Sequence, residues 1–112
     1  DTHRAGSSYL YTDAMILSPG CPVFRDDAGE LLAAPYPVTF LTSAAPNAGA
    51  AAANRPAELD RIPDALRQRA DLVLAAAAHA GAVTLVLGAW GCGVFRNDPA
   101  TVAATFAGSA RT

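Results

Sequence analysis

The chain has 112 residues, of which 52% are hydrophobic and 16% are charged, and its formal net charge is −2. This length suits one small domain or part of one, and the hydrophobic content excludes a disordered chain. The nearly balanced charge offers no basic surface for nucleic acid, and no apolar run is long enough for a transmembrane helix. Since no signal peptide is visible either, we expect a cytoplasmic protein with no direct nucleic-acid binding and no membrane contact.

Both ends of the sequence look like cuts within a longer protein. The chain starts at Asp1, and Arg111 and Thr112 come directly after a helix-like run. We therefore expect residues 1–112 to form a single, incomplete domain. Cys21 and Cys92 are compatible with one disulfide, but reduced cysteines are the better prediction for a chain with no disulfide-scaffold character. No Cys/His spacing is typical of a metal site, so we expect neither a metal nor a cofactor.

The first part of the chain predicts short strands and turns. Residues 9–17 (YLYTDAMIL) favour a strand that ends at Pro19-Gly20. Two short apolar runs, residues 23–25 and 30–32, flank the sequence DDAG, which is a hairpin signal. Residues 38–42 (VTFLT) are rich in β-branched and aromatic side chains and favour a buried strand.

The middle of the chain predicts a loop and then the one clear helix. Residues 43–54 (SAAPNAGAAAAN) are small and predict a loop. Apolar residues recur at helical spacing over residues 62–80, with Asp60 near the N-cap, Gly81 as the C-cap and Arg69 on a polar face.

The last part of the chain predicts a strand and a second helix. Residues 83–87 (VTLVL) form an unbroken apolar run, typical of a strand covered on both faces. Asp98 caps a second helix over residues 99–107, whose positive end adds to any anion site before it. Two strands linked by a helix, 38–42 and 83–87, are interpreted as a parallel βαβ unit, so the fold class is α/β.

The stretch GAWGCGVFRNDP, from Gly88 to Pro99, is dense in glycine where the predicted strand ends. Ligands gather at the carboxyl ends of parallel strands, and both this loop and 43–49 leave such ends on one side. Successive main-chain amides in a glycine-rich turn can bind an anion such as a diphosphate. Phe95 offers a flat face to a sugar or base, and Val94 closes the other side. The structural alternative is a tight turn whose glycines only permit close packing. It is about equally compatible with the pattern.

The whole chain resembles the bacterial-type poly(ADP-ribose) glycohydrolase family, specifically its C-terminal part. The matching stretches are residues 11–32 (YTDAMILSPGCPVFRDDAGELL), 35–49 (PYPVTFLTSAAPNAG) and 85–99 (LVLGAWGCGVFRNDP). The resemblance implies a partial macrodomain-like, three-layer α/β fold, with a mixed sheet and flanking helices. It also implies poly(ADP-ribose) or ADP-ribose as the ligand, and the N-terminal half of the same protein as a partner.

The resemblance assigns a set of ligand-binding residues. The ADP-ribose diphosphate and ribose would be bound by Gly91, Cys92, Gly93, Val94 and Phe95, and Asn47 would help to shape the pocket. A branched side chain at Gly93 is expected to block the ligand and to strain a backbone angle that needs glycine.

The catalytic signature of the family is absent from this sequence. That signature is Gly-Gly-Gly followed shortly by Gln-Glu-Glu, upstream of the matched region. Glu30 and Glu58 stand alone, so we nominate no catalytic residue in this chain. The expected function is therefore the binding part of a glycohydrolase that cleaves ribose–ribose O-glycosidic bonds, inactive when alone. The alternatives are a non-catalytic ADP-ribose-binding module and an inactive remnant.

Other residues have a functional and a structural interpretation, and in most of them the structural one is favoured. His79 is expected on the surface at a helix end, and Cys92 is expected to be a small tolerated residue rather than a nucleophile. Trp90 is expected in the core rather than stacked on adenine. Arg96 is equally compatible with a phosphate contact and with solvent.

Overall fold

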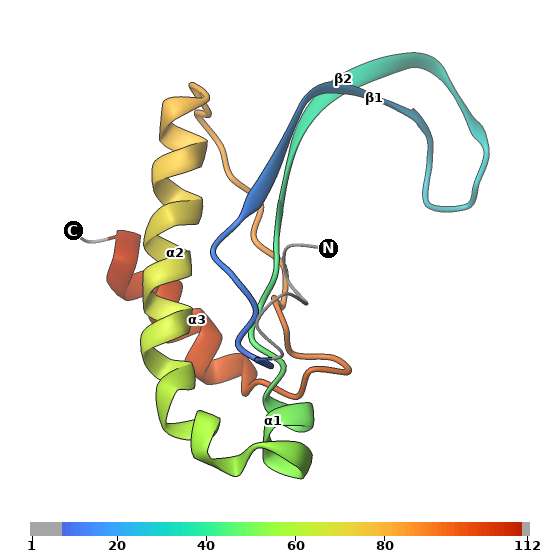
Figure 1. Ribbon diagram of the computed structural model, residues 1–112. Helices are drawn as coiled ribbons and strands as arrows, with labels where there is room; N and C mark the ends of the chain where they lie inside the picture. The colour runs from blue at the N-terminus through green and yellow to red at the C-terminus, as the bar shows by residue number, and fades with distance from the viewer. Residues whose placement is uncertain (1–7, 111–112) are drawn as a thin grey trace.

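The structure is a computed structural model and describes residues 8–110. The elements in chain order are β1 (Met15–Arg25), β2 (Leu31–Ser43), α1 (Ala48–Asn54), the 3-10 helix η2 (Pro56–Arg61), α2 (Ile62–His79) and α3 (Pro99–Ala110). The two strands form one long curved hairpin that reaches away from a body of helices (Figure 1). The radius of gyration is accordingly 15.8 Å, whereas a compact domain of this length has about 13 Å. The α/β class is confirmed.

The hairpin is antiparallel and longer than the sequence predicts. Met15 pairs with Ser43 at the body, and Arg25 pairs with Leu31 at the tip. The prediction that a strand ends at Pro19-Gly20 is wrong. The register shifts between Ser18 and Cys21, where Gly20 has a φ of +63°, so the strand bulges there and continues.

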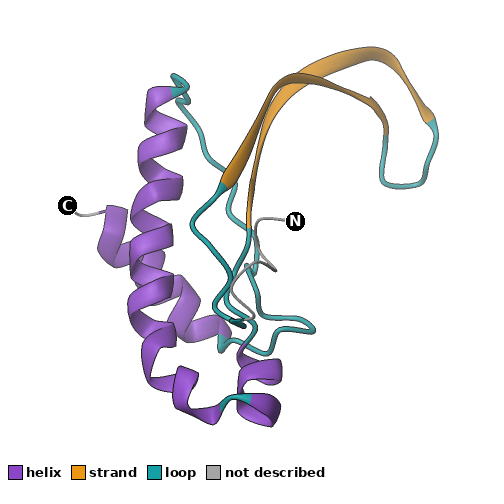
Figure 2. Cartoon of the chain, viewed as in Figure 1, coloured by secondary structure: helices purple, strands orange, loops and turns teal. Residues whose placement is uncertain are grey.

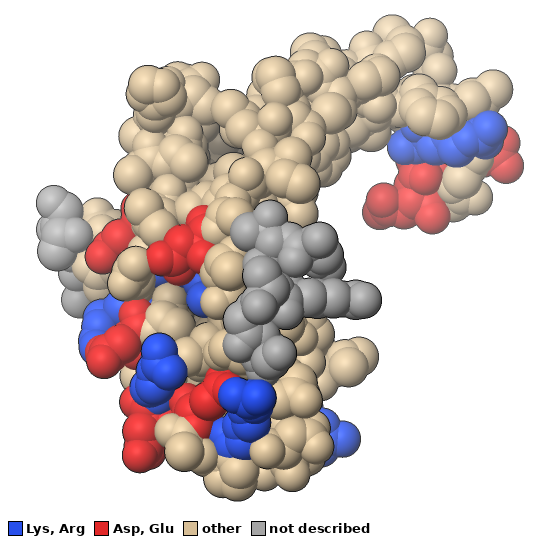
Figure 3. Space-filling model, in the orientation of Figure 1, with Lys and Arg blue, Asp and Glu red and all other residues tan. Residues whose placement is uncertain are grey.

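The predicted hairpin turn is confirmed at the tip. Asp26 Oδ1 accepts hydrogen bonds from the amides of Ala28 (3.0 Å) and Glu30 (2.9 Å), and Gly29 has a φ of +84°. The charged side chains of this turn gather at the tip, and the strands between the tip and the body carry none (Figure 3).

The prediction that residues 43–54 form a loop is wrong over its second half, which is helix α1. Asn47 is the N-cap, and its side chain accepts a hydrogen bond from the amide of Ala50 at 3.0 Å. Alanine is the residue with the highest helix propensity, so a run of alanines behind a good N-cap suffices for two turns.

The predicted long helix is confirmed as α2, and it begins after the turn of η2, with Arg61 rather than Asp60 at its N-cap position. Gly81 follows its end with a φ of +80°, as expected of a residue after a helix. The second helix is confirmed as α3, which is three residues longer than predicted. No described helix is long and apolar enough to span a membrane.

The hydrophobic core lies between α2 and α3. Leu66, Ala70 and Val73 of α2 are buried with Val102 and Phe106 of α3. Packing of these two apolar faces holds the helical body together, and Leu10 and Ala51 belong to the same buried cluster.

Arg69 does not lie on a polar face as predicted, because its side chain is buried in the body. Its Nε donates to Asp13 Oδ1 at 2.8 Å, and its Nη1 donates to the carbonyl of Ala44 at 3.1 Å. A buried guanidinium needs such partners. Arg69 thereby joins α2 to the segments on both sides of the hairpin.

The predicted strand 83–87 is not formed: in the described part of the chain the sheet is the two-stranded hairpin alone. The segment is a loop (Figure 2), and Val83 and Val86 are 100% and 90% exposed. The prediction that residues 38–42 and 83–87 form a parallel, hydrogen-bonded pair of strands is therefore wrong. The segment descends from α2 toward the end of β2, but a groove separates the two backbones.

Candidate functional site

The two loops that the sequence places at one end of the fold are in direct contact. Asn97 Nδ2 donates to the carbonyl of Pro46 at 2.7 Å and to that of Gly91 at 2.9 Å. The amide of Gly49 donates to the carbonyl of Phe95 at 3.0 Å. The segment after β2 and the glycine-rich loop therefore form one rigid surface.

The Gly91–Phe95 turn is held from its ends. The amide of Cys92 donates to the carbonyl of Ala89 at 3.1 Å. At the other end, the amide of Arg96 donates to the carbonyl of Gly93, and the amide of Asn97 donates to that of Gly91, both at 3.0 Å. The amides of Gly93, Val94 and Phe95 have no acceptor within residues 8–110. Val94 is 89% exposed, so the crest of the turn faces solvent. Free amides on a fixed, open turn are the arrangement that an anion site requires.

The glycine that needs its backbone freedom is Gly91, and the expectation that the backbone angle of Gly93 needs glycine is wrong. Gly91 has a φ of +70°, whereas Gly93 is outside the left-handed region, and a Cβ on Gly93 meets nothing within 4 Å. Arg96 closes the turn in the left-handed conformation, with a φ of +60°. Its side chain lies on Gly49, where a Cβ would come within 3.2 Å of Arg96 Cδ.

Asn47 is connected to the turn by Tyr11. While its Oδ1 caps α1, its Nδ2 donates to Tyr11 Oη at 3.3 Å. The rings of Tyr11 and Phe95 are tilted, with centroids 5.8 Å apart. Asn47 thus reaches the wall of the turn indirectly, by fixing the tyrosine on which Phe95 packs.

Cys92 and Trp90 pack against the body beneath the turn. Trp90 Nε1 donates to the carbonyl of Ser43 at 2.9 Å, and the centroids of the Trp90 and Phe106 rings are 5.6 Å apart. Cys92 is half-buried with a free thiol, and Cys21 is also free. His79 is exposed at the end of α2, as expected. The structural interpretation of Trp90 is therefore confirmed.

Helix α3 does not present a free N-terminus to the turn. Asp98 Oδ2 accepts hydrogen bonds from the amide of Thr101 at 2.9 Å and from its hydroxyl at 2.8 Å. This confirms Asp98 as the cap, but its negative charge opposes an anion at the same helix end. The anion site consequently depends on the amides of the turn rather than on the helix.

The carboxylates singled out in the sequence are bound to groups outside the turn. Glu30 belongs to the tip of the hairpin. Glu58 is buried, and its Oε2 accepts from Ser8 Oγ at 2.8 Å and from the amide of Tyr9 at 3.1 Å. Its role in the described fold is to attach residues 8–9 to η2.

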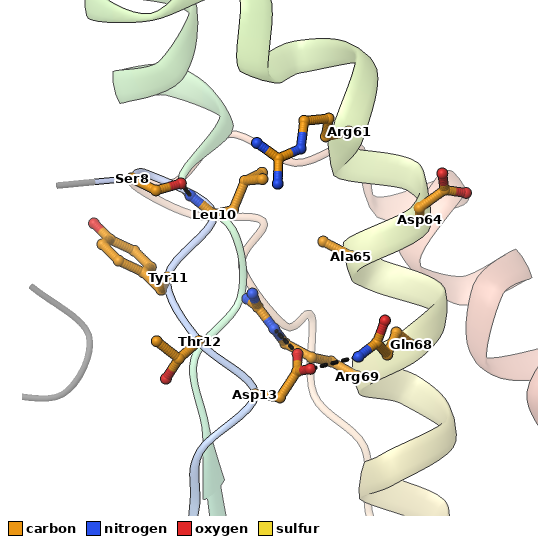
Figure 4. A pocket seen from close by; sticks show the side chains of 10 residues that line it. All are labelled: Ser8, Leu10, Tyr11, Thr12, Asp13, Arg61, Asp64, Ala65, Gln68 and Arg69. Carbon is orange, nitrogen blue, oxygen red and sulfur yellow. Dashed lines mark hydrogen bonds and ion pairs between the residues drawn. The ribbon is translucent and has the colours of Figure 1, made fainter. Parts of the chain in front are cut away.

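A second hollow, of about 540 Å³, lies between residues 8–13 and the first turns of α2 (Figure 4). Its central carboxylate, Asp13, accepts from Gln68 Nε2 at 2.6 Å and from Arg69 Nε at 2.8 Å. Both acceptor oxygens are thus engaged in holding the chain together. No group of His, Cys, Asp and Glu within residues 8–110 is arranged to hold a metal ion.

Sequence reasoning missed Asn97 and Tyr11 as residues that build the site. Asn97 is the buried polar side chain that joins the two loops. Its signal in the sequence is an asparagine directly before the Asp-Pro cap, which is indistinguishable from an ordinary turn residue without the partners it meets.

Comparison with solved structures finds close relatives among the bacterial poly(ADP-ribose) glycohydrolases. The chain matches the poly(ADP-ribose) glycohydrolase of Deinococcus radiodurans in complex with ADP-ribose at 58% identity and a TM-score of 0.91, over 94% of this chain and 42% of that one. The apo form of the same enzyme matches at 57% identity and a TM-score of 0.92, over 96% and 44%. The enzyme of Thermomonospora curvata matches at 58% identity and a TM-score of 0.86, over 95% and 38%.

The scan against family models found no match, and neither did the search of curated proteins. The chain spans less than half the length of the solved enzymes that it matches. Over nearly all of its own length, however, the chain matches these enzymes both in sequence and in fold. By this likeness of sequence and fold, the chain belongs to the bacterial-type poly(ADP-ribose) glycohydrolase family.

Proposed function

We propose that this chain supplies the diphosphate-binding wall of a poly(ADP-ribose) glycohydrolase domain, corresponding to the C-terminal part of that domain. The observation that carries the proposal is the Gly91–Phe95 turn, whose amides at 93, 94 and 95 are unpaired within the described residues. The turn is fixed by Asn97 and by Gly49, so it need not reorganise to bind. Preorganised amides in this geometry suit a pyrophosphate without any lysine or arginine.

The distal ribose would pack against Val94 and Phe95. Phe95 is held in place by Tyr11, and Tyr11 is held by Asn47, so the flat face offered to the sugar is preorganised too. Solved relatives at 57% to 58% identity were crystallised with ADP-ribose, which supports the same ligand for this chain.

The catalytic acid would come from outside this chain. Cleavage of an O-glycosidic bond needs an acid that protonates the leaving oxygen, and water that attacks the anomeric carbon. Glu58 is committed to Ser8 and Tyr9, and Glu30 lies at the hairpin tip. Neither carboxylate has a hydrogen bond to the turn within the described residues. We therefore expect that the 112 residues alone bind ADP-ribose without releasing it from poly(ADP-ribose).

Titration calorimetry with ADP-ribose tests the binding site through Gly93→Val. A Cβ at position 93 meets no atom within 4 Å, and φ there lies outside the left-handed region, so we expect the fold to tolerate the change. The branched side chain would fill the space that the diphosphate needs. We expect at least a tenfold loss of affinity with an unchanged melting temperature.

Gly88→Val is the matched control, because position 88 is equally open and precedes the turn. It should retain the affinity of the parent chain. Equal affinities for the Gly93 and Gly88 variants would contradict the assignment of the site. Release of ADP-ribose by the unmodified chain would contradict the absence of a catalytic acid, and would leave the binding site untouched.

A further inference from the structure

Residues 8–13, which precede β1, form a segment that buried charged side chains hold at both ends. At one end the buried carboxylate of Glu58 accepts a hydrogen bond from Ser8 Oγ at 2.8 Å. At the other end Asp13 Oδ1 accepts from Nε of the buried Arg69, also at 2.8 Å. Burying a charge is costly unless it is paired, so losing either contact would leave a charge unpaired inside the fold. The fold therefore fixes both ends of segment 8–13.

The middle of segment 8–13 is a turn that sends two neighbouring side chains in opposite directions. Leu10 points toward α2 and belongs to the hydrophobic core, whereas Tyr11 points away from that helix (Figure 4). Tyr11 has a φ of +59°, and its amide donates to the carbonyl of Ser8 at 3.4 Å. The amide of Asn47 donates to the carbonyl of Tyr9 at 2.7 Å and ties the turn to the start of α1. The direction of the Tyr11 side chain is thus set by a closed and anchored turn.

The two non-glycine residues with a positive φ within residues 8–110 both adjoin Phe95. Tyr11 packs on the Phe95 ring, with the ring centroids 5.8 Å apart, and Arg96, with a φ of +60°, follows Phe95 in the chain. A positive φ is unfavourable for bulky side chains, and it persists only where the surrounding structure imposes it. Residues strained in this way are concentrated at functional sites. In this chain the strain serves to place one aromatic ring.

The Phe95 ring concerns only one part of the proposed ligand. The amides at positions 93–95 would bind the diphosphate, which ADP-ribose shares with ADP. The ring would pack against the distal ribose, which ADP lacks. An unsupported ring would have to be ordered when the ligand binds, and this ordering lowers affinity. A contact that fixes the ring beforehand therefore favours ADP-ribose and leaves the binding of ADP unchanged.

We propose that Tyr11 is a positioning residue that makes the site selective for the distal ribose, because it holds the Phe95 ring in the orientation that the sugar meets. This inference rests on the proposed function and adds the residue through which the site distinguishes ADP-ribose from ADP. Tyr11 acts through its packing on Phe95. Asn47 supports it by donating from Nδ2 to Tyr11 Oη at 3.3 Å.

Calorimetric titration of the chain with ADP-ribose and, separately, with ADP tests the proposal through Tyr11→Ala and Tyr11→Phe. We expect Tyr11→Ala to lower the affinity for ADP-ribose about tenfold and to change the affinity for ADP less than about twofold. Tyr11→Phe keeps the ring and should retain most of the affinity for ADP-ribose. Collapse of the Gly91–Phe95 turn would weaken both ligands alike. The ratio of the two affinities therefore separates positioning of the ring from general damage to the site.

Tyr9→Ala is the matched control, because it removes the same kind of side chain from the same segment. The Tyr9 ring packs against the core cluster, and Tyr9 contacts Glu58 and Asn47 through its backbone. This variant should lower the melting temperature but leave the ratio of the ADP-ribose and ADP affinities unchanged. The same selective loss in Tyr9→Ala would overturn the proposal, because a loosened segment rather than the Tyr11 ring would then explain it.

Phe95→Ala, alone and combined with Tyr11→Ala, shows whether the tyrosine acts through the phenylalanine. Residues that act as a unit have non-additive effects, so once the Phe95 ring is absent, Tyr11→Ala should change the affinity for ADP-ribose less than about twofold further. Additive losses in the double variant would mean that Tyr11 acts on the ligand by another route, and they would contradict the proposal.

The two ligands also separate failure of this inference from failure of the proposed function. Equal losses of both ligands in Tyr11→Ala, or no loss of either, would overturn the selective role of Tyr11. If Gly93→Val still weakened both ligands in that case, the diphosphate site would stand without it. A parent chain that binds neither ligand would contradict the proposed function, and this inference with it.

Discussion

Gly91 has a φ of +70°, and a Cβ there would lie 2.5 Å from Ala45 Cβ and 2.7 Å from Asn97 Nδ2. Gly91→Ala therefore adds both backbone strain and a clash with the asparagine that joins the two loops. We expect a loss of about 3 kcal/mol in the free energy of unfolding. Chemical denaturation followed by tryptophan fluorescence measures it, since Trp90 lies directly before the turn.

The control at this scale is Gly93→Ala, two residues later, where a Cβ meets nothing within 4 Å. It should change stability by less than about 1 kcal/mol. If the two alanine variants were equally stable, Gly91 would not determine the shape of the turn. The comparison separates a glycine kept for the fold from one kept for the ligand.

Helix α1 illustrates how one side chain connects an element to the site. Asn47 caps the helix through Oδ1 and donates to Tyr11 through Nδ2. We expect Asn47→Ala to cost about 1 kcal/mol of stability and to speed hydrogen exchange in residues 48–54, because the cap is lost. Asn47→Ser should retain a cap, because serine is also a good N-cap residue, but its short side chain no longer reaches Tyr11.

Asn54→Ala is the matched control at the other end of α1. Its Nδ2 donates to the carbonyl of Ala50 at 3.2 Å on the exposed surface, so its loss should have a small effect. A similar loss for both asparagines would mean that capping by Asn47 contributes nothing specific. If Asn47→Ser weakens ADP-ribose binding while exchange in α1 stays slow, the pocket-shaping role of Asn47 gains direct support.

The molecule as a whole exposes large apolar side chains along the hairpin. Ile16 and Leu31 are 65% and 69% exposed, and the strands carry no charge between the tip and the body. Exposed apolar surface beside an unpaired strand edge promotes association. We expect the chain alone to self-associate with increasing concentration, and Ile16→Glu with Leu31→Glu to shift it toward monomer in sedimentation experiments.

Ala14→Glu with Ala33→Glu adds the same charge at exposed positions without removing a large apolar side chain. If this control pair dispersed the chain equally well, net charge rather than the hairpin surface would govern association. A chain that stays monomeric without any substitution would contradict the expectation altogether.

The sequence by itself determined the elements whose signals are local. The hairpin turn at Asp26 to Gly29, helix α2 with Gly81 after it, and the Asp98 cap of α3 each depend on residues a few positions apart. The family resemblance likewise depends on contiguous stretches, and solved relatives confirm it. Local hydrogen bonds and contiguous motifs can be read without knowing the tertiary contacts.

Only the tertiary structure decided the features that depend on distant partners. Residues 83–87 have the composition of a buried strand, yet a strand forms only where another backbone pairs with it, and none lies beside this segment within residues 8–110. Arg69 looks like a surface residue until Asp13 and Ala44 are placed around it. Gly91, rather than Gly93, needs to be glycine because Ala45 and Asn97 lie against it, and those contacts span 46 and 6 residues of sequence.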